Sequence, residues 1–220
     1  MRLFIAIELP DDIKEYLSRI QEKIAGKEDK ISLVKKEQMH LTLKFLGELQ
    51  PHNAENLRNI LKEVAFEPFS VNLDVIGVFP SENYIRVVWV GLKPEDKIME
   101  LQKNIDKKLE GMFKKEKGFK AHLTLARVKH IEDKVTFISK LKNIKIDNKK
   151  ISISNFKLIK STLTPEGPIY EAIESFGYFF VNAYLFLNGM FLLMFISNAL
   201  FYYELENNSK TLVKTLNKKI

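Results

Sequence analysis

The tetrapeptide His-Leu-Thr-Leu occurs twice in this chain, at residues 40–43 and again at 122–125. Each copy lies in an apolar, alternating segment that predicts a β-strand, over 39–46 and over 119–128. Successive side chains of a strand point to opposite faces, so each copy would bury its two leucines and present its histidine and threonine together on the other face. The repeat therefore predicts two related strands, each with a paired imidazole and hydroxyl.

The segments around the two copies alternate between strand and helix patterns. Outside the two signature strands, we expect strands over 2–9, 31–34, 69–79, 84–90 and 151–163, and helices over 12–25, 53–64, 95–109 and 134–141. These strands are too short, and too polar on one face, for a fully buried parallel sheet. We therefore predict an α+β fold of two pseudo-symmetric lobes around a central cleft, each lobe a mostly antiparallel sheet with helices outside.

The composition favours a polyanionic partner and excludes cysteine chemistry. The 35 lysines and arginines outnumber the 28 acidic residues, which gives a net charge of +7 and a pI near 9.3. This balance suits RNA, although lysine-rich surfaces also occur without such a partner. The absence of cysteine excludes disulfides, thiolate catalysis and cysteine-based zinc sites, and it is compatible with a reducing cytoplasm, where we expect the protein as a monomer.

The C-terminal part of the chain differs from the rest, which suggests a domain over 1–176 and an apolar extension with a basic end over 177–220. No charged residue occurs between 175 and 203, a run longer than the ~20 residues that span a bilayer. Its asparagines argue against a span, because each amide would need a partner in hydrocarbon. Three interpretations of this extension stay open: membrane contact through 177–203, an extra C-terminal helix that packs on the body or between subunits, or a tail that is no part of the working protein.

The two motifs together suit in-line hydrolysis of a phosphodiester. One imidazole, His40 or His122, takes a proton from water while the other gives a proton to the leaving oxygen. Thr42 and Thr124 can donate hydrogen bonds to the non-bridging oxygens. Arg127 would clamp the phosphate, but strict alternation turns it away from Thr124, so this assignment requires a bulge. We expect no metal, because the two histidines have no local ligand spacing.

Two further features are consistent either with substrate binding or with an ordinary structural role. Phe45 would stack on a base at the cleft mouth, or else belong to the core, as strand phenylalanines commonly do. Four lysines, Lys114, Lys115, Lys117 and Lys120, precede the second motif. They would guide RNA toward His122, or else form a solvated basic loop. The sequence leaves both choices open.

The chain resembles the 2H phosphoesterases, which carry two His-x-Thr-x motifs, and is most similar to their branch of RNA 2′,3′-cyclic phosphodiesterases, also called 2′-5′ RNA ligase-like proteins. The resemblance runs from residue 1 to about 176. It rests on four segments: the opening 2–7, the two motif segments 40–47 and 121–127, and the closing 161–168. It implies a bilobal fold with both motifs facing one cleft, and neither a metal nor another cofactor.

The resemblance also implies a reaction and a role for each motif residue. The expected substrate is an RNA with a 2′,3′-cyclic phosphate end, opened to a 2′-phosphomonoester, with reversible 2′-5′ ligation as a second reaction. His40 matches the family's proton donor, His122 its proton acceptor, and Thr42 and Thr124 its phosphate-binding threonines. Two alternatives remain: a phosphodiesterase for small cyclic nucleotides or 2′-5′ oligonucleotides, and a module that binds RNA ends without turnover.

Overall fold

The computed structural model describes residues 1–24 and 29–177, which belong to one compact unit. Within these residues no helix is both long enough and apolar enough to cross a membrane. The expected C-terminal helix and its membrane contact concern 177–203, of which all but residue 177 lie outside the described residues.

Nine strands and four α-helices make up the described part of the chain. The strands are β1 (Arg2–Glu8), β2 (Lys30–Leu33), β3 (His40–Glu48), β4 (Phe69–Ser81), β5 (Tyr84–Lys93), β6 (His122–His130), β7 (Lys150–Ile153), β8 (Asn155–Thr164) and β9 (Gly167–Gly177). The helices are α1 (Asp11–Glu22), α2 (Ala54–Lys62), α3 (Asp96–Lys108) and α4 (Lys134–Asn143), with short 3-10 turns η1 (Lys36–Gln38) and η2 (Pro51–Asn53).

All strand pairs are antiparallel, and the two motif strands are neighbours at the centre of the sheet. The order is β7-β4-β5-β6-β3-β1-β8-β9, with β2 also paired to β6. Strands β3 and β6 pair at one position only, Leu41 with Leu123. This narrow junction divides the sheet into a first lobe (β3, β1, β8, β9) and a second lobe (β6, β5, β4, β7 with β2).

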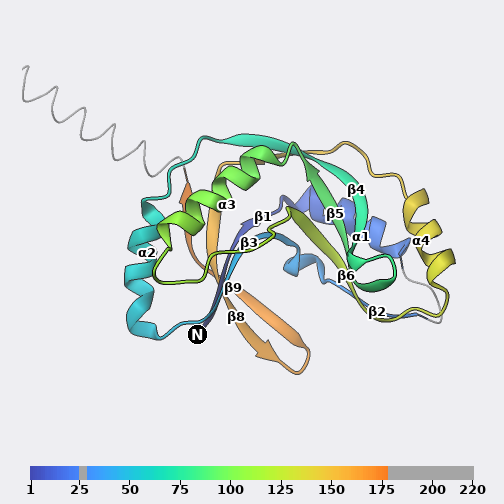
Figure 1. Ribbon diagram of the computed structural model, residues 1–220, viewed down its shortest axis with the longest axis horizontal. Coiled ribbons are helices and arrows are strands. Elements are labelled where there is room, and N and C mark those ends of the chain that lie inside the picture. Colours follow the sequence, from blue (N-terminus) through green and yellow to red (C-terminus); the bar gives the residue numbers. More distant parts are fainter. Residues whose placement is uncertain (25–28, 178–220) are drawn as a thin grey trace, which may run out of the picture. The chain divides into compact units, whose positions relative to one another are not determined.

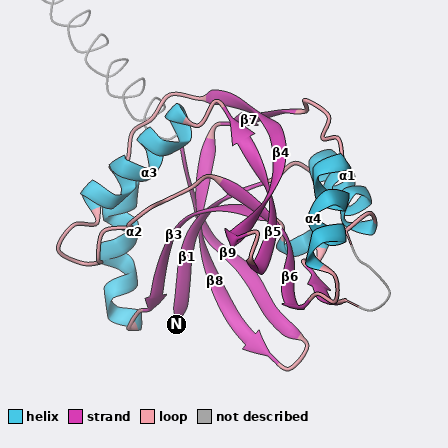
Figure 2. Ribbon diagram, turned by 45° about the vertical axis from the view of Figure 1, so that its right-hand side comes forward, coloured by secondary structure: helices cyan, strands magenta, loops and turns pink. Residues whose placement is uncertain are grey.

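Each lobe carries two helices on its outer side (Figures 1 and 2). Helices α2 and α3 contact β9 and β3 in the first lobe, whereas α1 and α4 contact β6 and β4 in the second. The amphipathic helices thus cover the faces of the sheet that bury leucine and isoleucine. The predicted α+β architecture of two mostly antiparallel lobes with helices outside is confirmed.

The lobes do not correspond to the two halves of the sequence, because the chain exchanges strands between them. Strand β4 follows the first motif but pairs with β5, and β8 follows the second motif but pairs with β1. The prediction of one strand over 151–163 is therefore wrong. The chain leaves the sheet at Ser154, where the buried positions change phase from Ile151 and Ile153 to Phe156 and Leu158. A single regular strand cannot follow this change, and β7 pairs with β4 while β8 pairs with β1.

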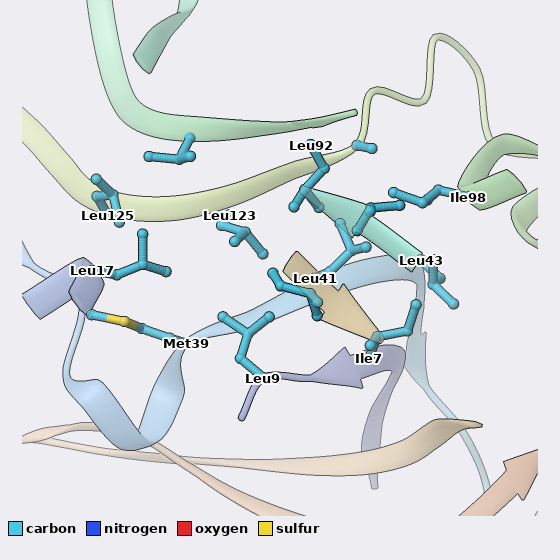
Figure 3. Packing of buried hydrophobic residues seen from close by; sticks show 14 of the residues in the cluster. Ile7, Leu9, Leu17, Met39, Leu41, Leu43, Leu92, Ile98, Leu123 and Leu125 are labelled. Carbon is cyan, nitrogen blue, oxygen red and sulfur yellow. The ribbon is translucent and has the colours of Figure 1, made fainter. Parts of the chain in front are cut away.

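The leucines of both motifs are buried together in the main core (Figure 3). Along β3 and β6 the burial pattern is the same: histidine and threonine are partly exposed, and the leucines on either side of threonine are buried. Burial of each leucine side chain contributes about 1.5–3 kcal/mol, which pins both strands with their motif faces outward. The predicted division of each motif between two faces is confirmed.

Candidate active site

The four polar motif side chains lie on one face at the junction of the two lobes. In an antiparallel pair centred on Leu41 and Leu123, His40 lies toward Thr124, and Thr42 lies toward His122. The leucines occupy the opposite, buried face. The motifs, 82 residues apart in the chain (122 − 40), are thus brought to one place by a single strand contact.

Both imidazoles are held in the same tautomer by a backbone carbonyl two residues earlier. The Nδ1–H of His40 donates to the carbonyl of Gln38 over 2.7 Å, and that of His122 to the carbonyl of Lys120 over 2.7 Å. A carbonyl oxygen can only accept, so the ring proton is on Nδ1 and the lone pair on Nε2 is left for chemistry. Neither Nε2 atom contacts a protein donor or acceptor in the described part of the chain.

Two aromatic rings position His40. Phe4 of β1 lies 4.9 Å from its ring centroid, and Tyr170 of β9 lies 5.4 Å away in an edge-on arrangement. Phe4 and Ile159 belong to a small apolar cluster on this face, against which Tyr170 packs. Burial raises the pKa of the Tyr170 hydroxyl, and the charge of Arg127 acts in the opposite direction. Tyr170 therefore lies next to His40 and within electrostatic reach of Arg127.

A second pair of aromatic rings positions His122. Phe79 of β4 lies edge-on with its centroid 4.9 Å from the imidazole, and Trp89 of β5 lies 6.3 Å away. The indole packs directly over Gly77, where a Cβ would overlap its ring. Lys120 also contacts this ring, with its Nζ 4.4 Å from the indole centroid.

The surroundings of the two rings favour their neutral forms. Burial lowers the pKa of His40 to about 4; the carbonyl of Gln38 opposes this, and the charges of Arg127 and His122 lower it further. Burial also lowers the pKa of His122, against the hydrogen bond to the carbonyl of Lys120. Both imidazoles are therefore neutral in the free protein at pH 7, and the ring that donates a proton must gain it when the anionic substrate binds.

In an NMR titration of the free protein, we expect the His40 ring to titrate near pH 4 and the His122 ring below its usual 6.5. The folded pKa values lie below the unfolded values, so the free energy of unfolding should fall as the pH falls from 6.5 toward 4. Replacement of Arg127 with glutamine should raise the pKa of His40, since a nearby positive charge is lost, and Lys103→Gln on the outer face of α3 should not. A His40 ring that titrates at 6.5 or above would contradict the environment described.

Arg127 faces the site because β6 contains the bulge that its assignment requires. Along β5 the pairing passes from Ala126 to Thr124 and skips Leu125. The extra residue shifts the alternation by one position, so Arg127 is exposed on the same side as Thr124. Its charge lowers the pKa of His40, which places the guanidinium within electrostatic reach of that ring.

Strand β3 has the same bulge, which gives Phe45 the position equivalent to that of Arg127. Along β1 the pairing passes from Lys44 to Thr42 and skips Leu43. Phe45 pairs with Phe4 across the strands and is 66% exposed, so the interpretation as a core residue is wrong. The two motifs therefore differ at one site-facing position, with an aromatic ring beside the first and a cation beside the second. Base stacking by Phe45 stays a prediction.

Four aromatic residues of the site are not predicted from the sequence: Phe4, Phe79, Trp89 and Tyr170. Phe4 and Trp89 lie on strands next to a motif strand, Phe79 lies one strand further out, and Tyr170 lies on β9, two strands beyond β1. Only the pairing of distant strands therefore reveals them. The one available signal was the position of Tyr170 two residues after the closing segment of the resemblance. Among residues 1–24 and 29–177, no three histidine, aspartate or glutamate side chains are grouped so that they could hold a metal ion.

Comparisons with known proteins agree with this architecture. The sequence model of the family described as LigT like Phosphoesterase matches the chain twice in succession, over 7–89 and 90–170, with one motif in each match. A Methanocaldococcus jannaschii protein named RNA 2′,3′-cyclic phosphodiesterase is 42% identical over 176 residues, which cover 79% of this chain and 99% of that protein. A protein of the same name from Archaeoglobus fulgidus is 36% identical over 177 residues, or 80% of this chain and 99% of that one.

The fold also has a close counterpart among solved structures. A crystal structure of a Thermus thermophilus protein superimposes with a TM-score of 0.69 at 28% identity and covers 80% of this chain and 97% of that one. The family match extends over most of the chain, and the two relatives match along nearly their whole length. With its two motif strands at the centre of a two-lobed antiparallel sheet, this chain belongs to the LigT-like phosphoesterase family.

Proposed function

We propose that this chain hydrolyses the 2′,3′-cyclic phosphate at the 3′ end of an RNA to a 2′-phosphomonoester, without a metal ion. The observation that carries the proposal is the pair of imidazoles, His40 and His122, whose free Nε2 atoms lie on one face at the junction of the lobes. Relatives that share 42% and 36% of their residues with this chain are named for that activity.

In the proposed mechanism His122 acts as the base and His40 as the acid. Water attacks phosphorus and loses its proton to Nε2 of His122, while the bond from phosphorus to O3′ breaks and O3′ takes a proton from Nε2 of His40. Return of the proton from His122 to His40 through solvent completes the cycle. In 2′-5′ ligation a 5′-hydroxyl takes the place of water, so His122 is again the base and His40 the acid. The two histidines exchange these roles when O3′ attacks a 2′-5′ bond and the cyclic phosphate forms again.

The hydroxyls of Thr42 and Thr124 and the guanidinium of Arg127 stabilise the charge that develops on the non-bridging oxygens. Neither hydroxyl has a hydrogen-bond partner within the described residues, so both are available to an anion. The phosphate anion also offsets the positive charge of Arg127, which otherwise holds the pKa of His40 low. Binding of the substrate thus helps His40 to acquire the proton that it donates.

Phosphorus NMR of an RNA with a 2′,3′-cyclic phosphate end tests the proposal. With the full chain and excess EDTA, we expect complete conversion to the 2′-phosphomonoester at the same rate as without the chelator. A 3′-phosphate product would contradict the proposed leaving group, loss of activity in EDTA would contradict the metal-free mechanism, and an unchanged substrate would leave only a binding function.

The division into a catalytic domain over 1–176 and an extension over 177–220, and the monomeric state, remain part of the proposal. In sedimentation equilibrium of the full chain, a mass of twice 25.6 kDa or more would contradict the monomeric state. The proposed reaction needs only residues within 1–176.

A further inference from the structure

A dense group of unpaired positive charges lies on the loop that leads into β6. This basic loop, residues 114–120, carries four exposed lysines: Lys114, Lys115, Lys117 and Lys120. None of them pairs with a carboxylate within the described residues, whereas lysines elsewhere on the surface, such as Lys93 and Lys108, do. The loop contains a single acidic residue, Glu116. Its charge is therefore available to an external anion.

The basic loop is fixed to the body of the protein by a buried polar anchor. Lys44 of β3 donates through Nζ to the carbonyl of Lys114 over 2.7 Å and forms a buried ion pair with Asp106 of α3. The same carboxylate accepts from the backbone N–H of Glu116 over 3.0 Å. Gly118 completes the turn with φ +68°, a conformation that favours glycine. Because the backbone is held at both Lys114 and Glu116, the loop that carries the lysines is already in place without a ligand, which lowers the entropic cost of binding.

The end of the basic loop reaches the second half of the active site. Lys120 lies against Trp89, and its carbonyl accepts the Nδ1–H of His122. A row of positive charge therefore begins beside the catalytic imidazole, at Lys120, and continues along the chain back to Lys114. A mononucleotide at the site would occupy only the inner end of this row.

We propose that the basic loop binds the phosphodiester backbone of the RNA strand that leads to the cyclic phosphate. The inference rests on the proposed function and deepens it, because it makes a polynucleotide the preferred substrate over a small cyclic nucleotide. Contacts with backbone phosphates are strongly salt-dependent, with a slope of about −0.7 per neutralised phosphate for single strands. Three lysines then correspond to a slope of about −2 and to a 10–100-fold change in affinity near 0.1 M salt.

The test compares the triple variant Lys114→Gln/Lys115→Gln/Lys117→Gln with the wild-type full chain. A 5′-fluorescein-labelled ten-nucleotide RNA with a 2′-phosphate end serves as the binding probe, measured by fluorescence anisotropy between 0.05 and 0.3 M KCl, and hydrolysis of 2′,3′-cyclic CMP reports on the catalytic site. Lys120 stays unchanged because it contacts Trp89. As a matched control, the variant Lys23→Gln/Lys103→Gln/Lys145→Gln removes the same charge from exposed lysines outside the loop.

We expect the loop variant to bind the RNA about 10–100-fold more weakly, to lose about 2 from its salt slope, and to hydrolyse 2′,3′-cyclic CMP like the wild type. The control variant should lose much less RNA affinity. Equal RNA binding by the two variants would overturn the proposal. A loss of cyclic CMP hydrolysis in the loop variant as large as its loss of RNA affinity would also overturn it, because the loop would then support the catalytic site rather than bind the RNA strand. If the wild type hydrolyses neither cyclic CMP nor an RNA with a 2′,3′-cyclic phosphate end, the proposed function fails. The anisotropy measurement still decides whether the loop binds RNA.

Discussion

Replacement of His122 with alanine is expected to lower kcat for opening of the cyclic phosphate by about 10²–10⁴-fold, the usual contribution of a positioned general base. The loss should be nearly the same at all substrate concentrations, because Thr42, Thr124 and Arg127 still bind the anion. The ring is partly exposed and its neighbours Phe79 and Trp89 remain in contact with each other, with their centroids 5.0 Å apart. We therefore expect the fold to persist, as circular dichroism and thermal unfolding would show.

His40→Ala should cause a loss of similar size with a normal substrate, but the two variants should differ when the leaving atom changes. A sulfur in place of O3′ leaves as a thiolate and needs no proton. If His40 is the acid, His40→Ala should recover most of its activity on this substrate, while His122→Ala should stay impaired. The opposite pattern would reverse the two roles. The exposed His52 of η2 supplies the control, since His52→Ala should retain full activity.

Full activity in either His40→Ala or His122→Ala would remove the two-histidine mechanism. A double variant offers a further check, because groups that act in one concerted step are not additive. We expect His40→Ala/His122→Ala to be little worse than either single variant.

The motif strands and their faces were predictable because both depend on local periodicity. Alternation over a few residues assigns His40 and Thr42 to one face of the strand and Leu41 to the other. The same tetrapeptide at 122–125 predicts the same division between two faces. A bulge in β6 follows from the sequence only if Arg127 is assumed to face the site. Nothing in the local pattern marks Leu125 as the extra residue. Its counterpart in β3 was not anticipated, and it turns Phe45 outward.

The pairing of distant strands was beyond the reach of the sequence. Tyr170 reaches His40 only because β9 and β8 form a hairpin at the edge of the first lobe, and Trp89 reaches His122 only because β5 lies beside β6. The exchange of β4 and β8 between the lobes could not be predicted from the sequence either, because the pattern of an antiparallel strand with one apolar face fits both lobes equally well. The change of phase at Ser154 was the only local sign of that exchange.

The bulge in β3 also explains why a lysine is buried behind the active site. By strict alternation Lys44 would face the site with Thr42, but the extra residue, Leu43, turns it into the interior, where it is 2% exposed. Burial alone would raise the pKa of its partner Asp106, but hydrogen bonds from Lys44, Gln102 and the backbone of Glu116 outweigh this and hold that pKa below its usual range. The carboxylate is therefore ionised at neutral pH and neutralises the buried ammonium.

Asp106→Ala is expected to lower the free energy of unfolding by about 3–5 kcal/mol, because it leaves the Lys44 ammonium buried without a counter-charge. Lys44→Met should cost a comparable amount, since it leaves the Asp106 carboxylate without its cation. The double variant Lys44→Met/Asp106→Leu should recover most of the loss, because apolar side chains of similar size need no desolvation. The measurement is urea unfolding with an unchanged m-value.

The exposed pair Lys108–Glu63, 2.7 Å apart, is the matched control: Glu63→Ala should cost less than about 1 kcal/mol. Equal, small losses for Asp106→Ala and Glu63→Ala would contradict the buried ion pair. The double variant separates stability from the second role of the pair, because it also removes the anchors of the basic loop at Lys114 and Glu116. We therefore expect it to be nearly as stable as the wild type yet to bind RNA more weakly, with hydrolysis of 2′,3′-cyclic CMP retained.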